Sequence, residues 1–214
     1  MNAIELLKDD HKTVRKLLAD LGETTTRAAK TRTELLARIA KEIEVHAKIE
    51  EEIFYPAFKD AAGEGDDEAM YFEALEEHHA AGDLVLPDLL ATDVTSDKFS
   101  GRAKVLKEMI EHHAGEEEKE MFPRARELLG NETLRELGAK MKARKAELMA
   151  APSGESLPSK ILGVVASAIS PGSDSDEDSV NLDGTRDDLP SPAARKAGNN
   201  AGKGKSGAGS TRRG

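Results

Sequence analysis

Apolar side chains recur every three or four positions along the chain as far as Gly130. The first such stripe contains Ile4, Leu7, Val14, Leu18 and Leu21. Comparable stripes run through residues 36–57, 71–85 and 103–121. This spacing places apolar side chains on one face of an α-helix, whereas the alternation typical of strands is weak. The pattern therefore predicts an all-α protein built from amphipathic helices.

The ends of these helices are indicated by capping and breaking residues. Asn2 is a suitable N-cap for the first helix, which we expect to end at Gly22. Gly130 and Asn131 are expected to stop one helix and to cap the next. The helices are predicted over about residues 2–22, 31–59, 66–90, 96–129 and 131–149.

Four long helices with short connections predict an antiparallel up-down four-helix bundle over residues 1–130. An additional helix is expected over residues 131–150. Pro56, Pro87 and Pro123 lie inside the predicted helices, and each should end or kink its helix because proline lacks an N–H donor.

Polar residues interrupt the apolar stripes at matching places. His11 lies on the first stripe, and His78 lies on the third. The second stripe carries a histidine and a glutamate four positions apart, as does the fourth: His46 with Glu50, and His113 with Glu117. A carboxylate on a buried stripe is costly unless a cation meets it. A single His-x3-Glu pair is commonly exposed, but two pairs on apolar stripes predict a metal site.

The two pairs also belong to an internal repeat. When Glu44 is set against Glu111, EVHAKIEEEIFYP (44–56) aligns with EHHAGEEEKEMFP (111–123). The same displacement along the chain, here called the repeat offset, places His11 on His78. One helical hairpin is therefore used twice, and the bundle is expected to have approximate two-fold symmetry.

Two histidine doublets leave alternatives open. His79 also lies on an apolar stripe and has Asp83 four positions later, although the repeat favours His78. His112 has Glu116 four positions later, although only His113 keeps the distance to the following proline that the repeat requires. Glu51 and Glu118 are expected to be exposed neighbours, either of which could enter the surroundings of the ligands.

The chain contains no cysteine, which excludes thiolate zinc sites and iron–sulfur clusters. Four imidazoles and two carboxylates suit iron, manganese or zinc. If Glu50 and Glu117 both bridge two metals, each metal receives about two imidazoles and two carboxylate oxygens, which leaves coordination positions open. These positions suit dioxygen, hydrogen peroxide or nitric oxide.

The composition changes near residue 150. Residues 151–214 are rich in Gly, Ser and Pro and carry eight basic and eight acidic side chains, so the formal charge of −10 belongs to residues 1–150. We expect a disordered tail over 151–214, whose partner the sequence does not identify. The acidic balance argues against nucleic acid as a partner. No apolar run of membrane length or secretion signal is present, which favours a cytoplasmic protein with no membrane partner.

The arrangement of His11, His46-x3-Glu50 before FYP, His78 and His113-x3-Glu117 before MFP resembles the hemerythrin-like HHE cation-binding domain. The resemblance covers about residues 3–130 and implies a non-haem di-iron centre, oxo- or hydroxo-bridged. It implies the following iron ligands: His11, His46, Glu50, His78, His113 and Glu117. The family includes oxygen carriers, iron or oxygen sensors, and proteins that react with peroxide or nitric oxide.

This chain departs from the oxygen carriers at two places. The carriers have a His-x3-His pair in the third helix, whereas Gly82 follows His78 here, and their second carboxylate is Asp at a longer spacing, whereas Glu117 lies at i+4. Fewer imidazoles favour reaction or sensing over carriage. The leading hypothesis is a di-iron protein that binds or reacts with a small oxidant, with catalase-like peroxide decomposition as a candidate activity. The alternatives are a non-catalytic iron or oxygen sensor and a metal-free bundle with buried His–Glu hydrogen bonds.

Overall fold

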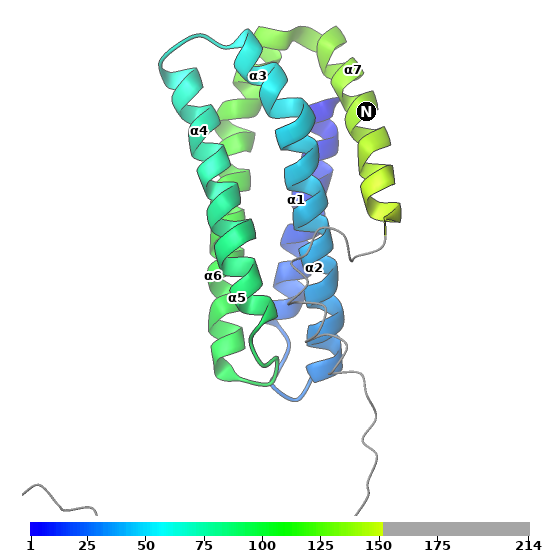
Figure 1. Ribbon diagram of the computed structural model, residues 1–214, viewed down its shortest axis with the longest axis vertical. Coiled ribbons are helices and arrows are strands. Elements are labelled where there is room, and N and C mark those ends of the chain that lie inside the picture. Colours follow the sequence, from blue (N-terminus) through cyan, green and yellow to red (C-terminus); the bar gives the residue numbers. More distant parts are fainter. Residues whose placement is uncertain (152–214) are drawn as a thin grey trace, which may run out of the picture. The chain divides into compact units, whose positions relative to one another are not determined.

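The computed structural model describes residues 1–151, and these residues form an antiparallel helical bundle (Figure 1). Four long helical segments run up and down, and the second half of the last element folds back along α1 and α2. No strand occurs within residues 1–151, and no helix there is long and apolar enough to cross a bilayer. The elements are α1 Ala3–Gly22, α2 Ala29–Ile49, η1 Glu50–Phe54, α3 Tyr55–Ala61, α4 Asp66–His78, η2 His79–Val85, α5 Leu86–Leu90, α6 Asp97–Glu116, η3 Glu117–Met121 and α7 Phe122–Ala150.

The predicted helix ends agree closely with the structure. Asn2 caps α1: its side chain accepts a hydrogen bond from the N–H of Glu5, whose carboxylate accepts one in return from the N–H of Asn2. Ser96 caps α6 in a similar way through the N–H of Phe99. The second helical segment begins at Ala29, slightly before the expected start. The predicted tail over 151–214 lies, apart from its first residue, outside the described residues.

The prolines act differently from the expectation that helices end or kink there. Each proline follows a π-helical segment (η1, η2 or η3), and the helical path continues beyond it. The N–H just before each proline bonds the carbonyl five positions back, from Tyr55 to Glu50, from Leu86 to Ala81 and from Phe122 to Glu117. The wider π turn accommodates a residue that has no N–H and whose ring would collide with the preceding turn.

The helix break at Gly130 is confirmed. Gly130 has φ 69°, a left-handed conformation that glycine adopts at no steric cost. The helix that follows packs back on the bundle, where Leu134, Leu137 and Met141 are buried. A fifth helix therefore covers part of α1 and α2.

The apolar core consists of two clusters. One contains Phe54, Tyr55, Phe58, Phe122 and Leu7 near the end where the N-terminus lies. The other contains apolar residues of α1, α2, α5 and α6 nearer the opposite end, Leu18, Ile39, Leu89 and Leu106 among them. In α1, the layer between Leu7 and Val14 is occupied by His11, which is only 2% exposed. A polar layer thus separates the two apolar clusters.

Candidate metal centre

The polar layer contains all six residues that the sequence singles out. His11 comes from α1, His46 from the end of α2, His78 from the end of α4, and His113 from α6, while Glu50 and Glu117 are the first residues of η1 and η3. Both of these π-helical segments thus begin at a carboxylate of the site. In proteins, π turns occur frequently at functional sites.

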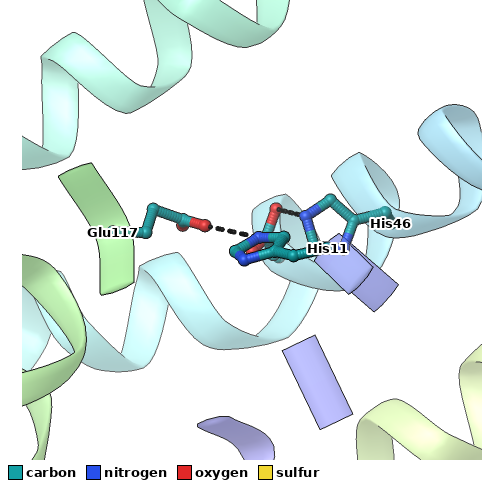
Figure 2. Close-up of side chains that lie close together, drawn as sticks. His11, His46 and Glu117 are labelled. Carbon is teal, nitrogen blue, oxygen red and sulfur yellow. Dashed lines mark ion pairs between the residues drawn. The ribbon is translucent and has the colours of Figure 1, made fainter. Parts of the chain in front are cut away.

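Each carboxylate faces two imidazoles. Oε2 of Glu50 lies 3.1 Å from Nε2 of His46 and 3.3 Å from Nε2 of His78. Oε2 of Glu117 lies 3.1 Å from Nε2 of His11 and 3.6 Å from Nε2 of His113. Figure 2 shows the carboxylate of Glu117 directed at the ring of His11, with the ring of His46 beside it. The two sets of contacts correspond under the repeat offset, so the repeat in the sequence is an approximate two-fold symmetry of the site.

The inner atoms of this layer fit a bound cation. Nε2 of His11 and His46, both oxygens of Glu50 and Oε2 of Glu117 are buried and have no hydrogen-bond partner within the described structure. Unsatisfied polar atoms of this kind are rare in protein interiors because their desolvation is costly. The ligand atoms of His11, His46, Glu50 and Glu117 lie within 4.8 Å of one another, as do those of Glu50, His78 and His113. Two neighbouring donor groups therefore share Glu50.

The electrostatics of the layer show what a cation would relieve. Burial, together with the nearby carboxylate of Glu117, raises the pKa of Glu50 well above its ordinary value. Burial also disfavours the charged form of Glu117, but His113 and His11 outweigh it and hold its pKa below the ordinary range. Burial lowers the pKa of His46 to about 4. Neutral imidazoles beside carboxylates are the forms that bind metal ions.

A second ring of carboxylates lies outside the imidazoles. Nδ1 of His78 lies 2.8 Å from Oε1 of Glu51, and Nδ1 of His11 lies 3.0 Å from Oε1 of Glu118. Nδ1 of His113 lies 2.8 Å from Oε2 of Glu77. Such contacts orient a metal-binding imidazole with its other nitrogen directed inward.

The fourth outer carboxylate completes the symmetry. Oδ2 of Asp10 lies 3.6 Å from Nδ1 of His46, and Asp10 also pairs with Lys145 of α7. The repeat offset relates Asp10 to Glu77 and Glu51 to Glu118. Sequence reasoning considered Glu51 and Glu118 but missed Asp10 and Glu77. The repeat was the signal that could have found them.

Tyr55 is a further residue of the site that the sequence analysis missed. Its buried hydroxyl donates a hydrogen bond of 2.9 Å to Oε1 of Glu117 and lies 3.3 Å from Nε2 of His78. Burial and the two carboxylates raise the pKa of this phenol well above 10. The repeat offset relates Tyr55 to Phe122, whose ring stacks on that of His11 with centroids 5.8 Å apart, so the site is asymmetric at this pair. Oε1 of Glu117 is thereby engaged, unlike the oxygens of Glu50.

The alternative histidines lie outside this arrangement. His79 is exposed and pairs with Asp83 at 3.0 Å. His112 is also exposed and lies 3.3 Å from Glu116 and 3.4 Å from Glu77. The structure therefore brings His78 and His113 into the layer and leaves their neighbours at the surface.

A cavity of about 470 Å³, here called the side cavity, reaches the layer from the surface. All four imidazoles line its inner end. Four of its lining residues reach the surface and mark its mouth: Glu44 and Lys48 of α2, and Gly82 and Asp83 of η2. Small molecules therefore have a route to the buried donors.

Known proteins place this arrangement in a family. The sequence model of the hemerythrin HHE cation-binding domain matches residues 2–125. The uncharacterised proteins Rv2633c of Mycobacterium tuberculosis and Mb2666c of Mycobacterium bovis are each 30% identical over 153 residues, covering 71% of this chain and 90% of theirs. A DNA nickase of a Nostoc species is 26% identical over 148 residues, which are 69% of this chain and 40% of the nickase.

A solved structure agrees with these relatives. The crystal structure of an HHE cation-binding domain-containing protein of Mycobacterium kansasii, a homologue of Rv2633c, is similar with a TM-score of 0.60 and 30% identity. The similarity covers 69% of this chain and 87% of that protein. Since both the sequence and the fold agree, this chain belongs to the hemerythrin HHE cation-binding domain family.

Proposed function

We propose that this protein holds two non-haem iron ions and that the site reacts with a small oxidant such as hydrogen peroxide, dioxygen or nitric oxide. One observation carries the proposal: four imidazoles converge on two buried carboxylates whose inner atoms lack partners within the described structure. A bundle with buried His–Glu hydrogen bonds alone would leave this many polar atoms unsatisfied at a high cost.

The donors divide naturally between the two ions. His11, His46 and Glu117 would hold one ion and His78 and His113 the other, with Glu50 serving both. The phenol oxygen of Tyr55 lies beside the second group, 3.3 Å from Nε2 of His78. In this assignment Glu50 is the shared carboxylate, and Oε1 of Glu117 stays with Tyr55.

Iron suits this mixture of imidazole and carboxylate donors, and when bound it would supply electron transfer and open coordination positions. The chain provides the surroundings for this chemistry. The outer carboxylates fix the orientation of the imidazoles, and aromatic residues such as Phe54 and Phe122 exclude water on one side. Gly82 leaves space at the mouth of the side cavity, through which an oxidant would arrive.

Adjacent histidines offer a matched test. We expect full-length protein loaded with iron to consume hydrogen peroxide, with two molecules giving two of water and one of dioxygen, measured with an oxygen electrode. His78→Ala should lose bound iron and peroxide consumption, because His78 faces Glu50, whereas His79→Ala should keep both, because His79 is exposed. Equal behaviour of the two variants would contradict the assignment.

The same preparation separates the oxidant reaction from the other functions of the family. If the reduced protein forms an oxygen adduct that lasts for hours and releases dioxygen intact under vacuum, oxygen carriage would replace the oxidant reaction as the function of the site. A protein that binds iron but changes none of the three oxidants would support a non-catalytic sensor or iron-binding module instead.

A further inference from the structure

The side cavity is larger than any oxidant with two or three atoms requires. Its volume is about 470 Å³, whereas one molecule of liquid water occupies about 30 Å³. Pockets that bind organic ligands have volumes of about 300–1,000 Å³, mostly apolar walls and a few polar groups. The side cavity therefore has the size of a site for an organic molecule.

The apolar wall of this cavity lies one helical turn from the imidazoles. In α1, Val14 follows His11 by three positions, and in α2 and α6 Ile43 and Ile110 precede the site histidines by three. The wall residues all line the cavity, and most are buried: Val14, Ala40, Ile43, Ala81, Leu86 and Ile110. An apolar chain lying against this wall would have one end at the imidazoles.

Gly82 creates part of this space. It belongs to η2, and a Cβ atom built on it would meet no atom within 4 Å. The residues around the mouth are polar, with His79 and Asp83 paired at 3.0 Å on one side and Lys48 and Glu44 paired at 2.9 Å on the other. The cavity is therefore apolar inside and polar at its rim.

The hydrogen-bonding groups around the inner end select the head group of a ligand. Six carboxyl groups surround the four imidazoles: Glu50, Glu117, Asp10, Glu51, Glu77 and Glu118. Their oxygens are hydrogen-bond acceptors. An O–H head group can donate a hydrogen bond to such an acceptor, whereas an anionic carboxylate head group has no proton to donate.

We propose that the side cavity binds a linear aliphatic molecule with a neutral O–H head group, an alcohol or a hydroperoxide. The chain lies against Val14, Ile43 and Ile110, and the head group lies at the imidazoles. The proposal deepens the proposed function in one respect, since an aliphatic hydroperoxide bound in this way lies where the oxidant is expected to react.

Binding of 1-alkanols to metal-free full-length protein tests this inference. Titration calorimetry with 1-propanol to 1-octanol should show affinity rising by about fourfold for each added methylene, as expected for burial of a hydrocarbon chain. Fatty acids of the same chain lengths should bind more weakly than the alkanols. Affinity that does not depend on chain length, or fatty acids that bind better, would overturn the proposal.

Two glycine variants locate the binding. Gly82→Leu should abolish the dependence on chain length by filling the cavity, whereas Gly101→Leu, at another helical position where a Cβ meets no atom within 4 Å, should preserve it. Equal alkanol affinities of the two variants would show that the alkanols bind outside the side cavity, and this would overturn the proposal. Ile43→Ala, which enlarges the cavity, should favour longer alkanols, so the proposal stays testable if Gly82→Leu fails to fold.

These measurements require no bound iron. If the native protein holds two irons per chain but does not bind alkanols, this inference is wrong and the proposed function stands. Alkanol binding without iron uptake would remove the proposed function alone.

Discussion

Each imidazole of the site has a carboxylate oxygen within 3.6 Å of each of its two nitrogens. His78 is the clearest case, because Nε2 faces Glu50 at 3.3 Å and Nδ1 faces Glu51 at 2.8 Å. An outer carboxylate fixes the tautomer and increases the basicity of the inner nitrogen. The outer residues should therefore control metal affinity without touching the metal.

Glu51 and its neighbour Glu52 permit a matched comparison. Glu51→Ala should lower iron affinity by about 10- to 100-fold, measured by competition with a chelator, because His78 loses its orienting partner. Glu52 is about equally exposed but pairs with Arg144 at 2.7 Å, so Glu52→Ala should leave the affinity near the native value. Similar affinities for both variants would show that the outer carboxylates have no orienting role.

Tyr55 is the residue where the two halves of the site differ most. Tyr55→Phe removes the donor to Oε1 of Glu117 and leaves this buried oxygen unsatisfied. The free energy of unfolding of the metal-free protein should fall by about 1–3 kcal/mol, measured by urea denaturation.

Tyr71→Phe is the control for this change. Tyr71 packs against Tyr55 with ring centroids 6.4 Å apart, and its hydroxyl makes no hydrogen bond within residues 1–151. Its substitution should leave stability nearly unchanged. If Tyr71→Phe costs as much as Tyr55→Phe, the hydrogen bond from Tyr55 to Glu117 makes no specific contribution to stability.

The sequence could predict the six inner residues because each lies on an apolar stripe and recurs at the repeat offset. It could not predict the role of Tyr55, since Tyr55 corresponds to Phe122 in the repeat, an exchange of aromatic residues that looks conservative. Asp10 and Glu77 were missed for another reason. Each adjoins one histidine in the sequence but pairs with a histidine of another helix, and only the packing of the helices creates that contact.

At the level of elements, the prolines predict that the α-helical hydrogen bonding is interrupted, but they do not predict which structure replaces it. A proline removes one hydrogen bond whether the chain kinks, stops or widens into a π turn, so the sequence leaves these outcomes undetermined. Here the helical path continues past Pro56 to Ala61 and past Pro123 to the break at Gly130, and the π turns η1 and η3 preserve this path. The same turns begin at Glu50 and Glu117.

The helix after Gly130 lies unusually close to the start of α1. A Cβ atom on Gly138 would lie 2.6 Å from the backbone nitrogen of Ala3, which is closer than Cβ atoms approach other atoms in proteins. Gly138→Ala should therefore lower the free energy of unfolding by about 1–3 kcal/mol, because one of the helices must move. Denaturation with urea measures this loss.

Gly101→Ala provides the comparison in this case. A Cβ atom at Gly101 meets nothing within 4 Å, and alanine is the better helix former, so stability should rise by up to about 1 kcal/mol. If Gly138→Ala were equally harmless, the fifth helix would not be packed closely on α1.

For the molecule as a whole, the polar layer divides the apolar core into two clusters. Without a cation, the carboxylates of Glu50 and Glu117 face each other in the interior, which costs free energy of folding. Metal binding and folding are therefore coupled, because an ion that binds only the folded chain stabilises it.

Removal of the metal should consequently destabilise the protein. At a free iron concentration a hundred times its dissociation constant, the loaded protein should be more stable than the chelated protein by about 2.7 kcal/mol for each site, measured by chemical denaturation. A variant with Glu50→Ala and Glu117→Ala together should show little dependence on iron. Native protein that unfolds identically with and without chelator would contradict the coupling.

The iron content of the purified full-length chain tests the central claim most directly. Metal analysis of protein loaded with ferrous iron should give two irons per chain, with less in Glu50→Ala and Glu117→Ala and an unchanged content in the exposed variant Glu52→Ala. One tightly bound zinc per chain, or full iron retention in both carboxylate variants, would contradict a site in which these two glutamates and four histidines hold two iron ions.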